Sequence, residues 1–498
     1  MSTRRNLNGM NVILFITDQE RAIQHFPPGW AEKNLPGETR LRRNGLTFQR
    51  AFCNSCMCSP SRATLMTGYF PAQHGVKWTL EQNMPASQYP QAELPLDFKN
   101  IATVMASLGY ATPYKGKFHL TKPANEDGVY VPEDVDRYGF QRWNPPDAGA
   151  NQDPNEYGGG DADNDGRFIH DNGLEQTGDE GVLSYLKGPA ATQQPFFLVV
   201  SLVNPHDVLG YPNAALQNGY DPSWLEGDIE LPATVNEDLS TKPRVQPEFL
   251  ALSNAGLGKL DPEQQRNYIN FYGNLMKSSD RYLVRILEIL SSRGLMDNTL
   301  VIKTSDHGEM GMTHGGLRQK NFNFYEETLR VPLIYSNPKL FPEPVSSEAM
   351  VSHVDFLPTL ASLMDAPASA RAPWQGVDYS PVVLDPSAEG RQKYIAFTYD
   401  DYQSGQPQGP YPGPRNHIIS IREERYKLAK YYDAAHPDLP YEWEMYDLAN
   451  DPLETRNLGH ERWDRNPEQE RAFRRLQLEL AEVERQRLQP RPSAAAAV

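Results

Sequence analysis

The chain has 498 residues, of which 39% are hydrophobic and 22% are charged, a composition typical of globular proteins and inconsistent with wholesale disorder. This length corresponds to roughly three average domains, although large α/β cores often fuse two of them. With 48 basic and 64 acidic residues the formal net charge is −16, which argues against a partner bound through phosphate neutralisation, and we expect no nucleic acid partner.

The N-terminal region predicts a buried strand and not a signal peptide. Arg4 and Arg5 precede an apolar run at 10–16, but this run ends in Asp-Gln-Glu-Arg at 18–21 without a small-residue cleavage site. The longest apolar stretch, 196–203, is far shorter than the about 20 residues that a membrane helix needs. We therefore expect a cytoplasmic protein with no membrane partner.

Strands and helices alternate along most of the chain, which predicts an α/β fold with a mostly parallel central sheet flanked by helices. Residues 121–180 and 207–262 are expected to be irregular lids or substrate walls, and 403–414 a linker or surface loop. Strands are expected at 11–17, 196–202, 299–304, 330–335 and 393–397, and helices at 100–108 and 262–292.

The C-terminal part has a different residue pattern, which predicts a smaller α+β subdomain. Antiparallel strands are expected at 418–432 and 442–448, followed by a helix with Asn466 as N-cap and Pro467 as first residue. We expect three units, namely an α/β catalytic domain over 1–385, an antiparallel sheet with a helix over 386–489, and a disordered tail over 490–498.

Three cysteines, Cys53, Cys56 and Cys58, lie within six residues. A single cluster of three cysteines excludes a disulfide framework. It also lacks the second, separate pair of ligands that a zinc site usually has. The string Cys-Ser-Pro-Ser-Arg at 58–62, with Thr-Gly at 67–68, predicts a helix that starts just after Cys58 and ends at Gly68. A nucleophile at a helix start faces free N–H groups, which lower a thiol pKa or stabilise an oxyanion.

The pattern Cys-x-Pro-x-Arg followed by Thr-Gly resembles the signature of type I, formylglycine-dependent sulfatases of the alkaline phosphatase-like superfamily. The resemblance implies that a formylglycine-generating enzyme oxidises Cys58 to an aldehyde. The aldehyde hydrate carries two hydroxyls on one carbon: one attacks sulfur and displaces the alcohol, and the other, once deprotonated, expels sulfate. Cys53 and Cys56 have no place in the motif and are interpreted as bystanders.

Two of the expected strands end in polar pairs, Asp18-Gln19 and Asp306-His307. The carboxyl ends of strands are where α/β sheets place ligands, although one strand that ends in Asp is a weak signal. The resemblance implies that Asp18, Gln19, Asp306 and His307 hold one divalent cation. An oxygen-rich set favours calcium, and the imidazole allows manganese or magnesium.

Further segments resemble the charged groups of the family. In Gly-Lys-Phe-His-Leu at 116–120, Lys117 is expected to contact the sulfate and His119 to deprotonate the second hydroxyl. His206, in Asn-Pro-His, matches the histidine beside the leaving group, and Lys320, in Gly-Gly-x-x-x-Lys, matches a sulfate-binding lysine. With Arg62 and the cation, these lysines are expected to form a cationic pocket for a tetrahedral oxyanion.

Some features are assigned structural or open roles. His74 is expected to be structural, and His314 is a candidate for the pocket wall. Asp-x-Asp-x-Asp-Gly at 161–166 copies the start of an EF-hand loop, but the twelfth position is Asn172, so a solvated loop is expected. Candidates to stack on a sugar or an aryl group are Trp78, Tyr130, Trp143, Tyr157, Tyr211 and Trp224.

Together these features predict an enzyme that hydrolyses a small aryl, carbohydrate or alkyl sulfate monoester. Two other functions stay open. A phosphodiester or phosphonate monoester hydrolase would use the same formylglycine and a similar metal set, and a sulfatase-like protein without activity would only bind its ligand. The sequence leaves the ester and the oligomeric state open.

Overall fold

The computed structural model describes residues 6–81, 84–147, 165–170, 180–212 and 220–491. As the sequence predicts, its centre is a mostly parallel sheet, with seven strands in the order β4-β5-β1-β6-β7-β2-β8. β7 is antiparallel to both neighbours, and the other pairs are parallel. The strands are β1 (Asn11–Asp18), β2 (Gly45–Phe52), β4 (Tyr114–Gly116), β5 (Phe197–Pro205), β6 (Thr299–Ser305), β7 (Leu333–Ser336) and β8 (Val345–Ser352).

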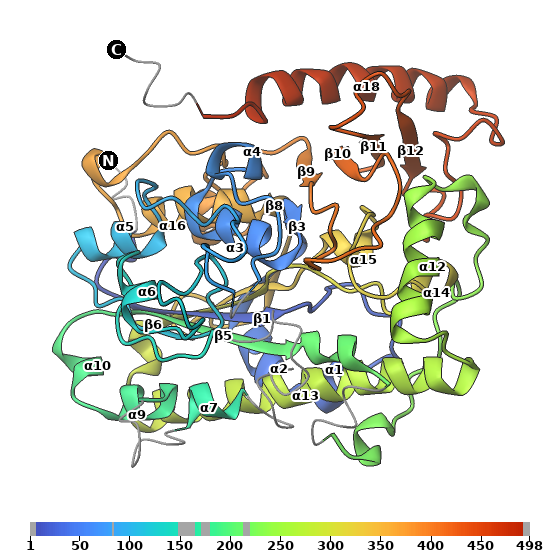
Figure 1. The fold of residues 1–498 in the computed structure, drawn as a ribbon. Coiled ribbons are helices and arrows are strands. Elements are labelled where there is room, and N and C mark those ends of the chain that lie inside the picture. The colour runs from blue at the N-terminus through green and yellow to red at the C-terminus, as the bar shows by residue number, and fades with distance from the viewer. Residues whose placement is uncertain (1–5, 82–83, 148–164, 171–179, 213–219, 492–498) are drawn as a thin grey trace.

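Helices cover both faces of this sheet (Figure 1). Short 3-10 helices include η2 (His206–Gly210). The α-helices are α1 (Trp30–Asn34), α2 (Pro36–Arg43), α3 (Cys58–Thr67), α4 (Pro71–His74), α5 (Ile101–Ser107), α6 (Glu133–Asp136), α7 (Gly166–Ile169), α9 (Val182–Lys187), α10 (Ala190–Gln193), α12 (Val245–Leu257), α13 (Pro262–Ser292), α14 (Thr313–Gly316), α15 (Glu326–Leu329), α16 (Phe356–Leu363), α17 (Ser380–Leu384) and α18 (Pro467–Arg487).

The side chains of β1 alternate between two hydrophobic cores, one on each face of the sheet. Val12, Leu14 and Ile16 belong to the core that contains residues of α3, α5 and α16. Ile13 and Phe15 belong to the core that contains residues of α2, α9 and α13. Because successive strand residues point to opposite faces, a strand in the middle of a two-sided core must be apolar throughout.

A second sheet has five strands in the order β12-β11-β10-β9-β3. β3 pairs in parallel with β9, so the sheet extends to the residue pair that precedes the cysteine motif. The expected antiparallel strands are present in it, and the strand expected at 393–397 belongs here and not to the central sheet. The strands are β3 (Ser55–Cys56), β9 (Ile395–Tyr399), β10 (His417–Arg422), β11 (Tyr426–Tyr432) and β12 (Glu442–Asp447).

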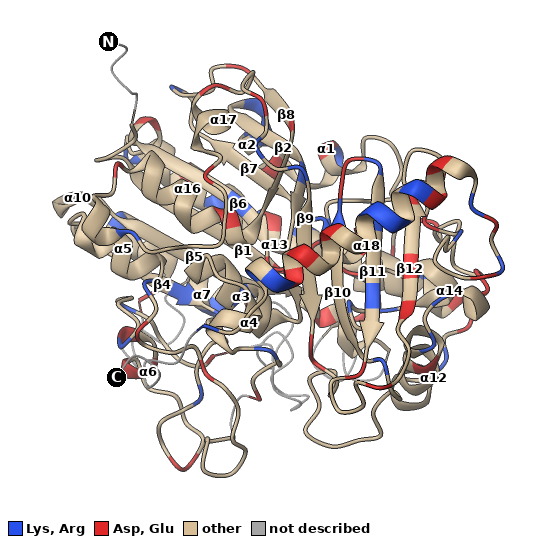
Figure 2. Cartoon of the chain, turned by 90° about the horizontal axis from the view of Figure 1, so that it is seen from above, with Lys and Arg blue, Asp and Glu red and all other residues tan. Residues whose placement is uncertain are grey.

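Helix α18 covers the second sheet, and its N-cap is Asn466 as predicted (Figure 1). Leu476 and Leu480 are buried against β10 and β11. Figure 2 shows that acidic and basic residues are interspersed along α18. One of them, Arg475, forms ion pairs with Glu423, which directly follows β10, and with Glu479 on the same helix.

Other expectations differ from the structure. The 207–262 segment is not irregular throughout, because it contains the 13-residue helix α12. Of the expected tail, residues 492–498 lie outside the described residues, as do 161–164 and Asn172 of the acidic loop. Within the described part of the chain, the helices are too short or too polar to cross a membrane.

Candidate active site

The carboxyl ends of β1 and β6 lie side by side and bring two polar pairs together. The two strands are parallel neighbours, with Thr17 opposite Ser305. The chain therefore leaves both strands at the same level, and the backbone N–H of Gln19 donates to Asp306 Oδ1 at 3.1 Å. Two segments almost 290 residues apart in the sequence form one edge of the site because parallel strands end on the same side of a sheet.

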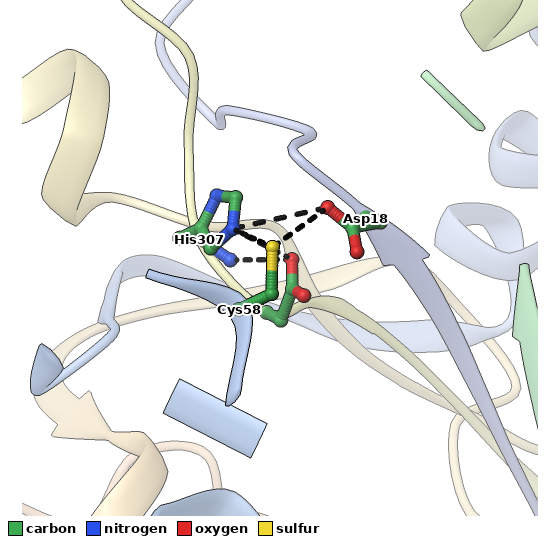
Figure 3. A group of neighbouring side chains, drawn as sticks. Asp18, Cys58 and His307 are labelled. Atoms are coloured by element: carbon green, nitrogen blue, oxygen red, sulfur yellow. Dashed lines mark hydrogen bonds and ion pairs between the residues drawn. The ribbon is translucent and has the colours of Figure 1, made fainter. Parts of the chain in front are cut away.

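Cys58, the first residue of α3, lies against this edge (Figure 3). Its Sγ is 3.2 Å from His307 Nε2 and 3.7 Å from Asp18 Oδ1. One potential ligand atom from each of Asp18, Cys58, Asp306 and His307 lies within 4.8 Å of all the others, and all four residues are buried. The structure thus brings the predicted nucleophile position and three predicted metal ligands into one cluster.

Burial and, after it, the neighbouring Asp18 carboxylate raise the pKa of the Cys58 thiol to about 11, against the lowering effect of Lys117 and Lys320. The prediction that the helix start lowers the thiol pKa is therefore wrong for this site. The free N–H groups of the first helical turn are too weak to offset the loss of hydration and a carboxylate at hydrogen-bonding distance. At neutral pH the unmodified side chain is an uncharged thiol.

The donor set fits a divalent cation. His307 Nδ1 lies 3.0 Å from the Gly308 carbonyl oxygen, which places the ring proton on Nδ1 and leaves the Nε2 lone pair facing the cluster. Burial alone raises the pKa of Asp18. Together, Lys117, His206 and Arg62 outweigh this effect and hold the pKa of Asp18 well below the usual range, so the carboxylate is ionised. A carboxylate pair with one imidazole is an ordinary protein set for such ions.

Arg62 lies behind the two carboxylates and not in the cavity. Its Nε donates to Asp306 Oδ2 at 2.9 Å, and its Nη2 donates to Asp18 Oδ2 at 3.1 Å. Its Nη1 donates to the carbonyl oxygen of Lys117 and to Ser201 Oγ, both at 2.8 Å. The side chain is fully buried. We predicted that Arg62 joins a cationic pocket for the oxyanion; in this structure its Nε and Nη2 contact the carboxylates, and it is not among the residues that line the cavity.

The two lysines each contact one of the predicted metal ligands. Lys117 Nζ is 2.6 Å from Asp18 Oδ2, and Lys320 Nζ is 2.6 Å from Gln19 Oε1. The amide nitrogen of Gln19 donates to Glu309, which fixes its oxygen toward the lysine. Burial lowers the pKa of Lys117, but the acidic groups around it, Asp18 foremost, together outweigh this effect. The net pKa is raised, so this lysine stays charged. Glu309 was not predicted, because its role depends on a contact across the fold.

His119 and His206 line the same cavity as Cys58. Burial lowers the pKa of both histidines well below the usual value, so both rings are neutral at neutral pH. In the described structure, the Nδ1 atom of each ring is buried without a hydrogen-bond partner. His119 Nε2 lies 2.7 Å from the Leu80 carbonyl oxygen, which makes Nε2 the donor and leaves Nδ1 free to accept a proton.

Asp147 holds the backbone that carries His119. Its carboxylate accepts from the N–H groups of Phe118 and His119 at 2.8 and 2.7 Å. His119 has a φ of 58°, a left-handed conformation that is uncommon outside glycine and that these two hydrogen bonds stabilise. Sequence reasoning missed Asp147, because a lone Asp in a Pro-rich loop gives no signal of what it caps.

The cavity beside Cys58 has a volume of about 430 Å³, within the usual range of small-molecule sites. Lys320 lines it together with Cys58 and the two histidines. Its other walls come from η2, from α12 and from the 403–412 segment. The last of these was expected to be a linker or surface loop, and instead it packs over the site.

Other predicted candidates lie elsewhere. His74 Nε2 is 3.1 Å from Thr64 Oγ1, which agrees with a structural role, and His314 stacks on Tyr325 without lining the cavity. Asp165 of the acidic loop accepts from two backbone N–H groups near the end of β5 and is buried. None of the described stacking candidates lines the cavity, and Tyr157 lies outside the described residues.

Two family models match the chain: Sulfatase over residues 10–366, and N-sulphoglucosamine sulphohydrolase, C-terminal, over residues 314–486. The ulvan-active sulfatase of Formosa agariphila is 25% identical over 90% of this chain and 76% of that protein. Human arylsulfatase A is 26% identical over 92% of this chain and 84% of that protein.

Two solved structures share the fold. A 2-O GAG sulfatase matches 99% of this chain and 94% of its own with a TM-score of 0.71 and 20% identity. The phosphonate monoester hydrolase of Agrobacterium radiobacter matches 95% of both chains with a TM-score of 0.65 and 20% identity. The same α/β architecture therefore occurs in enzymes of two ester specificities.

Proposed function

Because the chain belongs to the sulfatase family, we propose that it removes sulfate from a small aryl, carbohydrate or alkyl sulfate monoester through a formylglycine formed at Cys58. The chain is a sulfuric ester hydrolase, since the Sulfatase model matches most of it and its relatives are sulfatases. The observation that carries the proposal is the position of Cys58, which lines the cavity and lies 3.2 Å from His307 Nε2.

We propose that Asp18, Gln19, Asp306 and His307 hold one divalent cation. Two carboxylates, an amide oxygen and an imidazole form an oxygen-rich set that favours calcium and accepts manganese or magnesium. When bound, the cation supplies Lewis-acid polarisation of a sulfate oxygen. Arg62 acts as a positioning residue, because its donors hold one oxygen of each carboxylate.

Conversion of Cys58 needs a formylglycine-generating enzyme as maturation partner. Cys58 is 1% exposed in the folded chain, so we infer that this enzyme acts before the chain has folded around the residue. The hydrated aldehyde offers one hydroxyl that attacks sulfur and a second that, once deprotonated, expels sulfate and restores the aldehyde. Each turnover thus consumes one water and releases the alcohol and sulfate.

The charged and titratable groups around residue 58 divide into two roles. Lys117 and Lys320 contact the sulfate, since both ammonium groups lie beside the proposed metal ligands. His119 accepts the proton of the second hydroxyl through Nδ1, because its Nε2 faces a carbonyl oxygen. His206 donates a proton to the departing alkoxide, and Lys320 is the alternative acid.

The modification is tested by co-expressing the chain with a formylglycine-generating enzyme. Peptide mass spectrometry should find the aldehyde at Cys58 and not at Cys53 or Cys56, and turnover of 4-nitrophenyl sulfate should rise with the converted fraction. Cys58→Ala should be folded and inactive. Full activity in a preparation whose Cys58 is an intact thiol would refute the proposed chemistry.

The alternative, a phosphodiester or phosphonate monoester hydrolase, is favoured only by the fold shared with such an enzyme. A diester has an ester arm where a sulfate monoester has a bare oxygen, and each lost charge-assisted hydrogen bond costs about 1.5–3 kcal/mol, or roughly 10- to 150-fold in rate. We expect kcat/KM for an aryl sulfate to exceed that for the matched diester by this factor. A preference for the diester would make the alternative the better description.

A further inference from the structure

The cavity wall opposite the charged cluster is largely apolar. Helix α12 and the segment 403–412 approach each other across it, and the Glu248 carboxylate on α12 accepts from the Gly413 N–H at 2.9 Å. This bond connects α12 to the residue that directly follows the 403–412 wall. The apolar lining comes from Leu209, Phe249, Leu252, Leu257, Pro410 and Tyr411.

The wall is also poor in charge. Of the described residues that line the cavity, Lys320 is the sole lysine or arginine, and its Nζ already contacts Gln19 at the sulfate end. No described aspartate or glutamate lines the cavity. Arg318 lies behind the end of α12, where it donates to the carbonyl oxygens of Ser253 and Gly258 and is not among the lining residues.

The polar groups on the wall are neutral. Ser253 Oγ is buried, and in the described structure it has no hydrogen-bond partner, so it is available to a ligand hydroxyl or carbonyl group. Neutral hydroxyls and amides can form hydrogen bonds with an uncharged substrate and need no opposite charge on it. The neutral polar side chains of the lining are Thr79, Ser253, Gln319, Gln403, Ser404 and Gln406.

From this lining we propose that the enzyme selects sulfate monoesters whose alcohol is uncharged and carries an apolar ring or chain, and that it discriminates against alcohols bearing a carboxylate, a second sulfate or a quaternary ammonium group. The proposal rests on the sulfatase activity proposed above. A charged alcohol loses its hydration on entry and, apart from Lys320 at the sulfate end, meets no charged side chain among the described lining residues, whereas a neutral apolar one gains from the area it buries.

Matched pairs of aryl sulfates test this selectivity. One pair carries a meta-carboxylate or its neutral isostere, a meta-carboxamide, and the other carries a meta-trimethylammonium or a meta-tert-butyl group. With both members of a pair compared at equal pKa of the leaving phenol, on a line set by neutral aryl sulfates, we expect kcat/KM to be at least about tenfold lower for each charged member than for its neutral partner. Equal values within both pairs, or faster turnover of the charged esters, would overturn the proposal.

A charge placed on the wall should change the selectivity. Leu252 lines the cavity, and its neighbour Ala251 on the same helix is exposed and does not. Leu252→Arg should reduce or reverse the difference in kcat/KM between the meta-carboxylate and meta-carboxamide esters. Ala251→Arg should leave this difference as in the wild type. The proposal fails if the two variants behave alike.

The two proposals fail in different ways. If the fully converted enzyme hydrolyses none of the four esters and no other sulfate ester, the sulfatase proposal itself is refuted. If it hydrolyses all four at similar rates, the sulfatase proposal stands and the selectivity for uncharged alcohols is refuted. The wild-type series gives this result even where Leu252→Arg does not fold.

Discussion

Replacing Arg62 by methionine tests whether this residue holds the two carboxylates of the cluster in place. Arg62 is fully buried and donates to Asp18 and Asp306 at 3.1 and 2.9 Å. Arg62→Met keeps much of the side-chain volume but leaves both carboxylates buried beside each other without their shared cation. In protein freed of divalent cations, the loss of this guanidinium should therefore reduce the free energy of unfolding.

The structure sets the size of the effect. Breaking a buried ion pair by removing one partner costs about 3–5 kcal/mol, whereas an exposed pair contributes about 0–1 kcal/mol. At an unfolding entropy of about 2.1 cal/mol/K per residue, a chain of 498 residues has roughly 1 kcal/mol/K. Arg62→Met should lower the melting temperature in EDTA by about 3–5 °C.

Arg475 provides the matched control. It also pairs with two carboxylates, those of Glu423 and Glu479, but its side chain is 44% exposed. Arg475→Met should lower the melting temperature by less than about 1 °C under the same conditions. Scanning calorimetry in EDTA measures both melting temperatures. If the two variants lower the melting temperature equally, then burial does not increase the contribution of the Arg62 ion pairs to stability, and the positioning role is wrong.

Three further predictions concern catalysis, the cation and acid stability. His206→Ala should slow the hydrolysis of alkyl sulfates by about 100- to 10,000-fold and that of 4-nitrophenyl sulfate far less. Equal losses across a leaving-group series would limit His206 to substrate positioning. Asp306→Ala should abolish both activity and the one equivalent of calcium or manganese found by elemental analysis, while Asp161→Ala should retain both. If Asp306→Ala retained the metal, the metal site would lie elsewhere. Burial raises the pKa of Glu326, but Lys427 and Arg422 outweigh it and lower the pKa from 4.5 to about 2. The stability that this carboxylate supplies is present above pH 4.5 and lost as the pH falls toward 2, so the melting temperatures of Glu326→Gln and wild type should converge over that range. A constant difference would contradict the pKa shift.

The fold was predictable where the pattern is local. Strand β1 is apolar from Val12 to Ile16 and ends in Asp18, and β6 ends just before Asp306, so both strands and their polar ends follow from the sequence. That the two ends meet follows from parallel pairing. The long helix α13 has the bounds 262–292 that the sequence predicts, with Pro262 as its first residue and Gly294 shortly after its end.

The rest of the site depends on contacts between distant segments. The sequence identifies Arg62 as a conspicuous cation, but only the packing decides that its donors face Asp18 and Asp306 and not the cavity. Helix α12 was missed although Val245, Phe249 and Leu252 have helical spacing, because Pro243 and Pro247 interrupt the local signal. The Pro/Gly-rich composition of 403–414 indicates a turn-rich segment and says nothing about what it covers.

The proposed boundary near residue 385 separates segments that meet at the cysteine motif. Ser55 and Cys56 pair with Thr398 and Tyr399, so the strand before Cys58 belongs to the second sheet while α3 packs on the first. The segment that follows β9 then returns over the cavity as its wall. Residue 58 is therefore positioned by both sheets at once. On the proposed function, the N-terminal part supplies the charged cluster for the sulfate group, and α12 of that part and 403–412 of the C-terminal part together supply the surface that the alcohol meets. On this argument, changes of substrate within this architecture require substitutions in α12 and 403–412 and leave the charged cluster intact.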